Sequence, residues 1–118
     1  MKKQTMLTIY HNPRCSKSRQ TLELIKENSS KKINVIEYLK EPITQKDIEQ
    51  LLALLSCSPI EMMRVKEAEF KEQNLKDADD KTLIAAMVTT PKLIERPIVS
   101  NGNKAVIGRP PENALALC

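Results

Sequence analysis

The stretch LTIYHNPRCSKSR, residues 7–19, joins an apolar segment to a helical one through a loop that holds a cysteine. Leu7 to Tyr10 is short, apolar and bounded by polar residues, which predicts a buried strand. From about Ser16 to Glu27 apolar residues recur one turn apart, which predicts an amphipathic helix. Cys15 is therefore expected at the end of a strand and directly before a helix.

The segments after this stretch predict an α/β fold. Ile33 to Tyr38 (INVIEY) is rich in β-branched and aromatic residues and predicts a second strand. A right-handed crossover through the first helix makes the two strands parallel. The sequence TQKD at 44–47 matches a capping box, and the apolar spacing after it predicts an amphipathic helix. Residues 59–90 are helical and charged, which suggests an insertion between two halves of a sheet.

The last third of the chain predicts a β-hairpin and a final helix. The segment PIVSNGNKAVIG, residues 97–108, has two apolar runs around Asn101-Gly102, which is a strong hairpin signal. The segment RPPENALAL, residues 109–117, begins with prolines that a first helical turn tolerates and continues with helix formers. Together the elements predict one domain with a small sheet and helices packed on it.

The composition is that of one soluble, intracellular domain. The chain has 118 residues, 41% of them hydrophobic and 29% charged, which allows a modest core. Three cysteines without a secretory leader favour the reducing cytoplasm over a disulfide scaffold. The longest apolar run, Leu83 to Val88, is too short to span a bilayer. The net charge is +4, but the lysines are scattered and aromatic residues are few, so we expect no nucleic-acid or membrane partner.

Cys15 is the candidate nucleophile. A helix N-terminus and nearby cations lower the pKa of a thiol, and Arg14, Lys17 and Arg19 surround this cysteine. Backbone N–H groups at the start of the helix and the hydroxyl of Ser18 add an anion-binding cradle. The alternative is that Cys15 is a small buried residue beside a strand.

His11 is the only histidine of the chain, and it lies four residues before the cysteine. We expect it either to tune the thiolate or to make a structural hydrogen bond. A metal site would have to use His11, Cys15, Cys57 and Cys118, which contain no C-x-x-C pair and match no zinc spacing. The sequence therefore predicts no metal site.

Three arginines stand beside turn residues. Arg64 ends the run IEMMR, Arg96 precedes Pro97 in ERPIV, and Arg109 precedes a proline in GRPPE. The planar guanidinium of arginine can bind an oxyanion through two parallel hydrogen bonds, and it keeps its charge when it is partly buried. Each arginine taken alone is also a common surface ion-pair former. The bond between Arg96 and Pro97 is a candidate cis peptide.

Four motifs, YHNPRCSKSR, MMRVKE, RPIV and GRPPE, occur in this order and at family-like separations. Through them the chain, from about residue 6 to 117, resembles the glutaredoxin-coupled arsenate reductases of the thioredoxin-like superfamily. The resemblance implies an α/β fold with a thioredoxin-like mixed sheet and a helical insertion at about 59–90. The site residues that it implies are the nucleophile Cys15, the oxyanion-binding Arg64, Arg96 and Arg109, and the thiolate-tuning His11 and Ser18. The charge and position of Arg19 add it to the residues that are expected to tune the pKa of the thiolate.

The same resemblance implies a reaction, in which Cys15 attacks arsenate and forms a thiol-arsenate adduct on the way to arsenite. No cofactor is expected to be bound. Glutathione is the expected co-substrate and glutaredoxin the expected partner protein, because no second cysteine lies in the loop. Cys118, the last residue, is an alternative internal thiol for resolving the adduct.

Two other functions fit the same fold. Thiol-sensing regulators that bind RNA polymerase also carry an RPI segment, but they typically have a C-x-x-C switch in the first loop. Here Ser18 takes the place of the second cysteine and Arg109 is present, which favours the enzyme. The third possibility is a general glutathione-linked thiol oxidoreductase, for which the set of arginines would be superfluous.

Overall fold

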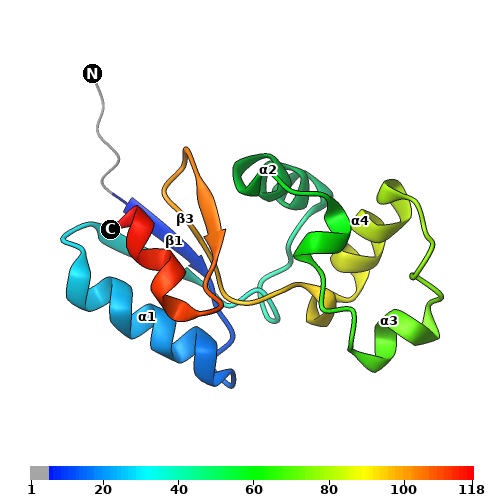
Figure 1. Cartoon of the computed structure of the whole chain (residues 1–118), viewed down its shortest axis with the longest axis horizontal. Helices are drawn as coiled ribbons and strands as arrows, with labels where there is room; N and C mark the ends of the chain where they lie inside the picture. The colour runs from blue at the N-terminus through cyan, green and yellow to red at the C-terminus, as the bar shows by residue number, and fades with distance from the viewer. Residues whose placement is uncertain (1–5) are drawn as a thin grey trace. The chain divides into compact units, whose positions relative to one another are not determined.

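The computed structural model describes residues 6–118, which form two compact units. The first unit consists of the chain up to Glu41 together with Arg96–Cys118, and the second consists of Pro42–Glu95. The first unit holds a sheet with two helices, and the second is mainly helical (Figure 1). Among residues 6–118, every helix is too short or too polar to cross a lipid bilayer.

The sheet of the first unit is mixed, with the strand order β2-β1-β3-β4. Its strands are β1 (Met6–Tyr10), β2 (Lys32–Ile36), β3 (Ile98–Ser100) and β4 (Ala105–Ile107). β1 and β2 are parallel, as a crossover through a helix requires, and β3 pairs antiparallel with both β1 and β4. The predicted α/β class, the strand–helix–strand unit and the hairpin are therefore confirmed.

Two details of the first unit differ from the prediction. β2 ends at Ile36, two residues earlier than predicted, because the chain turns at Glu37, whose carbonyl oxygen accepts the N–H of Glu41 at 2.9 Å. The final helix, η3 (Pro111–Leu117), is a 3-10 helix. Its N–H groups donate to the carbonyl three residues back, as in the 3.0 Å bond from Asn113 to Pro110, and this tight turn is common in short helical pieces.

The core of the first unit lies between one face of the sheet and two helices, α1 (Ser16–Asn28) and η3. Both helices cover the same face and lie side by side (Figure 1). The buried apolar residues of this core are Leu7, Ile9, Ile25, Val99, Ala114 and Leu117. Because the sheet fixes α1 along its length, the first turn of α1 is held beside the loop that follows β1.

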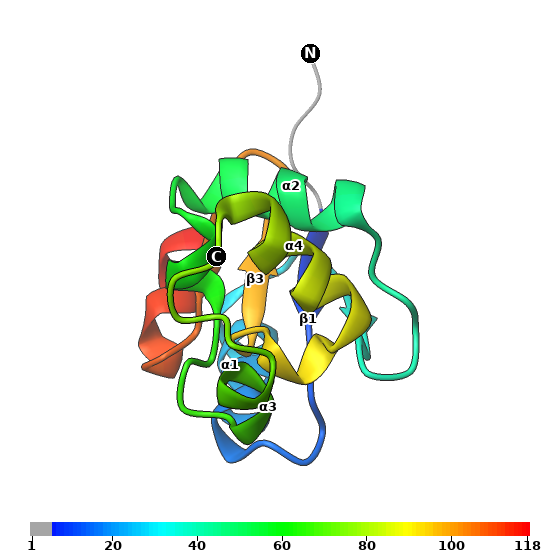
Figure 2. The same ribbon diagram turned by 90° about the vertical axis from the view of Figure 1, so that its right-hand side faces the viewer.

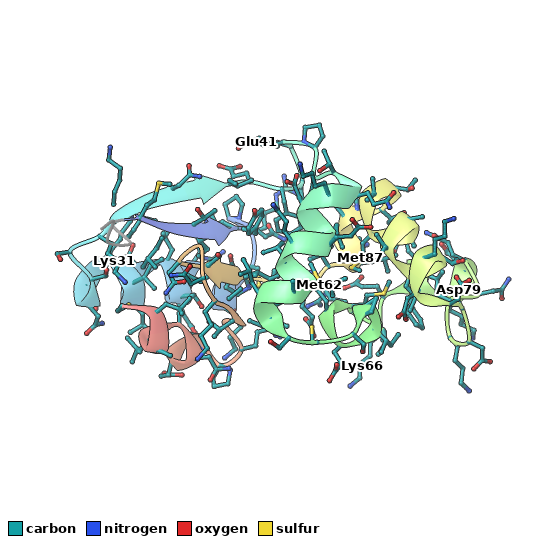
Figure 3. All side chains as sticks on the ribbon, turned by 90° about the horizontal axis from the view of Figure 1, so that it is seen from above. Lys31, Glu41, Met62, Lys66, Asp79 and Met87 are labelled. Carbon is teal, nitrogen blue, oxygen red and sulfur yellow. The ribbon has the colours of Figure 1, made fainter. Side chains whose placement is uncertain are left out.

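The second unit packs five short helices around its own core (Figure 2). They are α2 (Gln45–Leu55), η1 (Pro59–Met62), α3 (Ala68–Glu72), α4 (Asp80–Thr89) and η2 (Pro91–Leu93). The stretch 59–90 thus contains three separate helices within this unit. Met62 and Met87 lie in its interior, fully buried (Figure 3).

The capping box that starts α2 is formed as predicted. The hydroxyl of Thr44 accepts the N–H of Asp47 at 3.1 Å, and the carboxylate of Asp47 accepts the N–H of Thr44 at 3.0 Å. Ile48 and Leu51 of the helix are buried. The amphipathic pattern therefore correctly identified both the start and the inner face of this helix.

Candidate active site

Cys15 occupies the N-cap position of α1, at the junction between the loop after β1 and the helix. Its N–H donates to the carbonyl oxygen of Asn12 at 3.0 Å, and its own carbonyl accepts the N–H of Arg19 at 3.0 Å. The side chain is partly exposed, so small molecules can reach the sulfur. The predicted position between strand and helix is therefore confirmed.

The pKa of Cys15 lies below its ordinary value. Burial of the thiol acts in the opposite direction and raises the pKa, but other contacts outweigh it. The backbone N–H of Ser18, the side chain of Arg96 and the backbone N–H of Lys17 all stabilise the thiolate. Both backbone N–H groups belong to the first turn of α1, where the helix dipole is positive. The sulfur is therefore ionised more readily than a free thiol.

Arg96 and Arg109 gather at this sulfur. Nη1 of Arg109 lies 4.0 Å from Sγ of Cys15 and donates to the carbonyl oxygen of Arg96 at 3.4 Å. Nε of Arg96 is buried and has no hydrogen-bond partner among the described residues. Each arginine precedes a cis proline, Pro97 or Pro110, so the cis peptide predicted at Arg96-Pro97 is confirmed.

Gly108 allows the turn that carries Arg109 to lie close to α1. The N–H of Gly108 donates to the carbonyl oxygen of Pro97 at 2.8 Å. A Cβ atom at Gly108 would lie 2.8 Å from Oγ1 of Thr21, closer than real Cβ contacts permit, and 3.0 Å from Cγ of Pro97, which is a tight contact. A side chain at this position would therefore force its neighbours to shift.

His11 and Ser18 form a buried polar pair under the cysteine loop. Nδ1 of His11 lies 2.6 Å from Oγ of Ser18, and the N–H of Asn12 donates to the same oxygen at 3.0 Å. Burial lowers the pKa of His11, so its ring is neutral at neutral pH. His11 thus makes the structural hydrogen bond that was one of its two predicted roles. The tuning of the Cys15 thiolate by His11 stays a prediction. In it, His11 acts on Cys15 through its hydrogen bond with Ser18.

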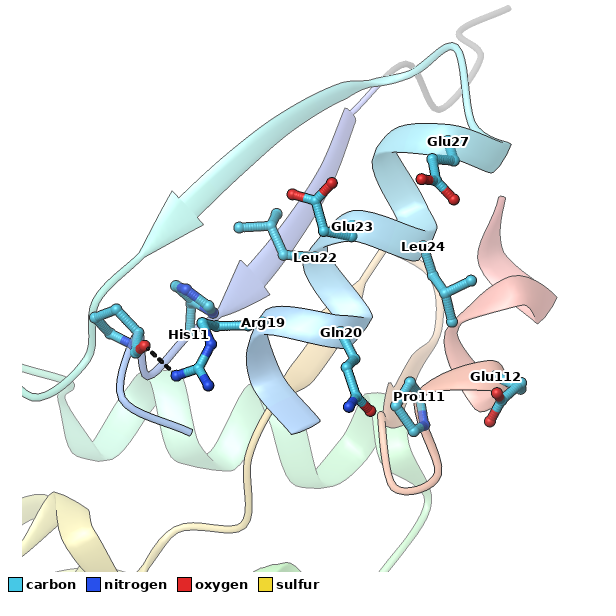
Figure 4. A pocket seen from close by; sticks show the side chains of 10 residues that line it. His11, Arg19, Gln20, Leu22, Glu23, Leu24, Glu27, Pro111 and Glu112 are labelled. Atoms are coloured by element: carbon cyan, nitrogen blue, oxygen red, sulfur yellow. Dashed lines mark hydrogen bonds between the residues drawn. The ribbon is translucent and has the colours of Figure 1, made fainter. Parts of the chain in front are cut away.

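Arg19 and Asn12 brace the backbone of the loop. Nη1 of Arg19 donates to the carbonyl oxygen of Pro13 at 2.9 Å, drawn as a dashed line in Figure 4. The side-chain oxygen of Asn12 accepts the N–H of Arg14 at 3.0 Å, and its backbone carbonyl accepts the N–H of Cys15. Asn12 was not among the predicted site residues, although asparagine at a turn beside proline is a signal that identifies it.

A hollow of about 770 Å³ runs along α1 (Figure 4). His11 and Arg19 line it at the end near the loop, and Pro111 and Glu112 of η3 line it on the other side of the helix. Cys15 is not one of its lining residues. The sulfur of Cys15 is therefore next to Arg96 and Arg109 and outside this hollow.

Arg64 belongs to the second unit, where two carboxylates balance its charge. Its Nε donates to Oε2 of Glu67 at 2.9 Å, and its Nη1 lies 3.5 Å from Oε1 of Glu95. Its backbone N–H donates to the carbonyl oxygen of Leu93 at 2.7 Å. In the first unit, Arg96, Arg109 and the backbone N–H of Ser18 lie around the sulfur of Cys15, whereas His11 pairs with Ser18 and Arg19 with the carbonyl oxygen of Pro13. Neither glutamate was predicted, although Glu67 follows Arg64 at the i,i+3 spacing of a local ion pair.

The other two cysteines do not resemble Cys15. Burial raises the pKa of Cys57 and of Cys118, so both thiols stay protonated at neutral pH. Nζ of Lys31, which follows α1, donates to the carbonyl oxygen of Leu117 at 2.8 Å, so Cys118 lies at the far end of the helix from Cys15. The 13 residues of α1 span roughly 20 Å along the helix axis. This geometry argues against resolution of an adduct by Cys118.

All three cysteines are free thiols. Within the part of the chain that the structure describes, no three His, Cys, Asp or Glu side chains lie close enough together to hold a metal ion.

Residues 10–117, most of the chain, match the ArsC family. The chain belongs to the ArsC family. It is 51% identical to the Escherichia coli (strain K12) protein YfgD over 112 residues, which are 92% of this chain and 93% of that protein. It is 41% identical to a Haemophilus influenzae protein named arsenate reductase over 112 residues, which are 92% of this chain and 96% of that protein.

The fold agrees with that of solved ArsC-family structures. A structure titled arsenate reductase from Vibrio cholerae matches with a TM-score of 0.89 and 44% identity, over 97% of this chain and 98% of that one. The resemblance stated from the four motifs is thereby confirmed for the family and for the thioredoxin-like fold. The family match does not assign roles to the individual site residues, and these roles stay predictions.

Proposed function

We propose that this ArsC-family protein is an arsenate reductase, an oxidoreductase that converts arsenate to arsenite through the thiolate of Cys15. Relatives of similar length and fold bear the name arsenate reductase, which supports the reaction class. The single observation that carries the proposal is a partly exposed sulfur whose pKa is lowered by backbone N–H groups of α1 and by Arg96. The thiolate is the nucleophilic form of cysteine.

Three arginines bind the oxyanion in this proposal. A thiolate that attacks an anion is repelled by it, so positively charged side chains must already surround the anion to offset this repulsion. The interaction of Arg96 with the Cys15 thiolate and the 4.0 Å approach of Arg109 to the sulfur support the role of these two. The role of Arg64 is supported by the motif MMRVKE and by the fixed position that Glu67 gives its guanidinium.

The chemistry proceeds in two stages. First, the sulfur of Cys15 forms a bond to arsenic, and one arsenate oxygen leaves as water after it takes up protons. The thiol of glutathione then attacks the adduct. Arsenic gains two electrons and leaves as arsenite, while the sulfurs of Cys15 and glutathione are oxidised to a mixed disulfide. Glutaredoxin reduces this disulfide and restores the thiolate.

Two features favour an outside thiol as the reductant. Cys118 lies at the opposite end of α1 from Cys15, and burial raises the pKa of both Cys57 and Cys118. Neither thiol is therefore well suited to attack the adduct. Three free cysteines also suit a reducing compartment, and we place the reaction in the cytoplasm, where glutathione is abundant.

The test is a coupled assay that follows arsenate-dependent NADPH consumption with glutathione, glutaredoxin and glutathione reductase. The wild-type protein should consume NADPH only when arsenate is present, and Cys15→Ser should abolish the signal. Omission of glutaredoxin should stop turnover after the first cycle. Equal activity of Cys15→Ser and wild type would refute the role of Cys15. Activity with arsenate and glutathione but without glutaredoxin would refute only the coupling.

A further inference from the structure

Glu67 occupies the Nε end of the Arg64 guanidinium through a 2.9 Å hydrogen bond. A ligand that needs two parallel donors therefore has to use Nη1 and Nη2. Oε1 of Glu95 lies 3.5 Å from Nη1, one of these two donors. Any oxyanion that binds Arg64 in this way therefore has a carboxylate oxygen as its neighbour.

The backbone fixes Arg64 and Glu95 beside each other. An antiparallel bridge pairs Met63 with Ile94. The N–H of Glu95 donates to the carbonyl oxygen of Met62 at 2.8 Å, which extends the pairing on one side of the bridge. The side chains of Arg64 and Glu95 are 22% and 28% exposed, so solvent screens their charges less than it would at an open surface.

The two glutamates have different partners. Glu67 is engaged at both oxygens, with Oε2 on Arg64 and Oε1 3.7 Å from Nζ of Lys92. For Glu95, in contrast, the described residues provide one ion pair, the 3.5 Å contact with Arg64. Glu95 therefore keeps hydrogen-bond-accepting capacity beside Nη1 of the guanidinium.

A carboxylate at this position distinguishes between tetrahedral oxyanions. Hydrogen arsenate and hydrogen phosphate carry an O–H group at neutral pH, which can donate to the carboxylate in a strong charge-assisted hydrogen bond. Sulfate carries no proton, so its oxygen would face the carboxylate with like charge and no hydrogen bond. A site with a fixed acceptor rejects a ligand that lacks the matching donor.

We infer that Glu95 is a specificity-determining residue, which makes the Arg64 guanidinium favour oxyanions that carry a proton over sulfate. The inference rests on the proposed function, in which Arg64 binds the oxyanion. It adds to that function a substrate class, the protonated tetrahedral oxyanions, and a physical basis for discrimination against sulfate.

The experiment measures how well phosphate and sulfate protect Cys15 from iodoacetamide at neutral pH and constant ionic strength, with the modified peptide quantified by mass spectrometry. In the wild-type protein sulfate should require a concentration at least about tenfold higher than phosphate for the same protection. Glu95→Gln should reduce this preference by about tenfold, because the charge repulsion is lost. Glu69→Gln is the matched control: Glu69 pairs with Lys92 at 3.3 Å and makes no ion pair with Arg64, so the preference should persist.

The outcomes separate this inference from the proposed function. If Arg64→Ala weakens protection by both anions while Glu95→Gln leaves their ratio unchanged, the selectivity role of Glu95 is overturned and the oxyanion site stands. If neither anion protects the wild-type protein, or if Arg64→Ala changes nothing, the role of Arg64 in the proposed function fails and the inference fails with it.

Discussion

Substitution of Gly108 by alanine should destabilise the protein by a steric clash whose partners can be named. The added Cβ would lie 2.8 Å from Oγ1 of Thr21, 3.0 Å from its Cγ2 and 3.0 Å from Cγ of Pro97. Thr21 cannot turn away cheaply, because it is buried and its hydroxyl donates to the carbonyl of Lys17 at 2.8 Å. Overpacking of this kind costs about 1–3 kcal/mol of unfolding free energy, and with three tight contacts we expect about 2 kcal/mol.

A double-mutant cycle with Thr21→Ala tests this reasoning, because that change removes two of the three clashing atoms. Urea denaturation of the four proteins should show that Gly108→Ala costs less in the Thr21→Ala background, by about 1 kcal/mol. Gly102→Ala is the matched control. Gly102 is exposed with a φ of 93°, so its substitution is strained for a backbone reason that Thr21→Ala cannot relieve. Additive free energies for Gly108 and Thr21 would refute the steric account.

Three further predictions concern Ser18, Cys118 and Cys15. Ser18→Ala should lower the free energy of unfolding by about 1–3 kcal/mol, because it leaves Nδ1 of buried His11 without its partner; urea denaturation should show no such loss for exposed Ser16→Ala. Cys118→Ser should turn over arsenate at the wild-type rate in the coupled assay, and a large loss of rate would contradict the separation of the two sulfurs along α1. Because folding lowers the pKa of Cys15, its thiolate stabilises the folded state most above the ordinary thiol pKa, and this stability is lost as the pH falls through the lowered value. The stability of wild type relative to Cys15→Ser should therefore rise with pH in that window, as denaturation at a series of pH values would show, and a flat difference would refute it.

Local patterns in the sequence were sufficient to predict most of the fold. Periodicity located α1 and α2, a short apolar run located β1, a β-branched and aromatic run located β2, and the Asn101-Gly102 signal located the hairpin. These signals work because each depends on neighbours within a few residues. The tight turn of η3 and the end of β2 at Ile36 depend on which carbonyl oxygen accepts each backbone N–H. Local composition does not determine this choice of partner.

The site was predictable where its residues lie in one loop and less so where they come from distant segments. Cys15 at a helix start could be recognised from the residues around it, and so could the cations on either side. Arg109 lies 94 positions after Cys15 in the chain, so no local pattern predicted its approach to the sulfur and only the resemblance to a family suggested it. Glu67 was missed although it follows Arg64 at a local ion-pair spacing, and Glu95 was missed because it reaches Arg64 from a distant part of the chain, which no local pattern reveals.

The most direct measurement is the rate at which iodoacetamide alkylates Cys15 as a function of pH, in a Cys57→Ser/Cys118→Ser background that leaves one thiol. The rate should follow the thiolate fraction, with a midpoint below that of an ordinary thiol. Arg96→Gln should move the midpoint upward, whereas Arg14→Gln, an exposed neighbour in the sequence, should leave it in place. A midpoint at the ordinary thiol value, unchanged by Arg96→Gln, would contradict the claim that this fold stabilises a thiolate at Cys15.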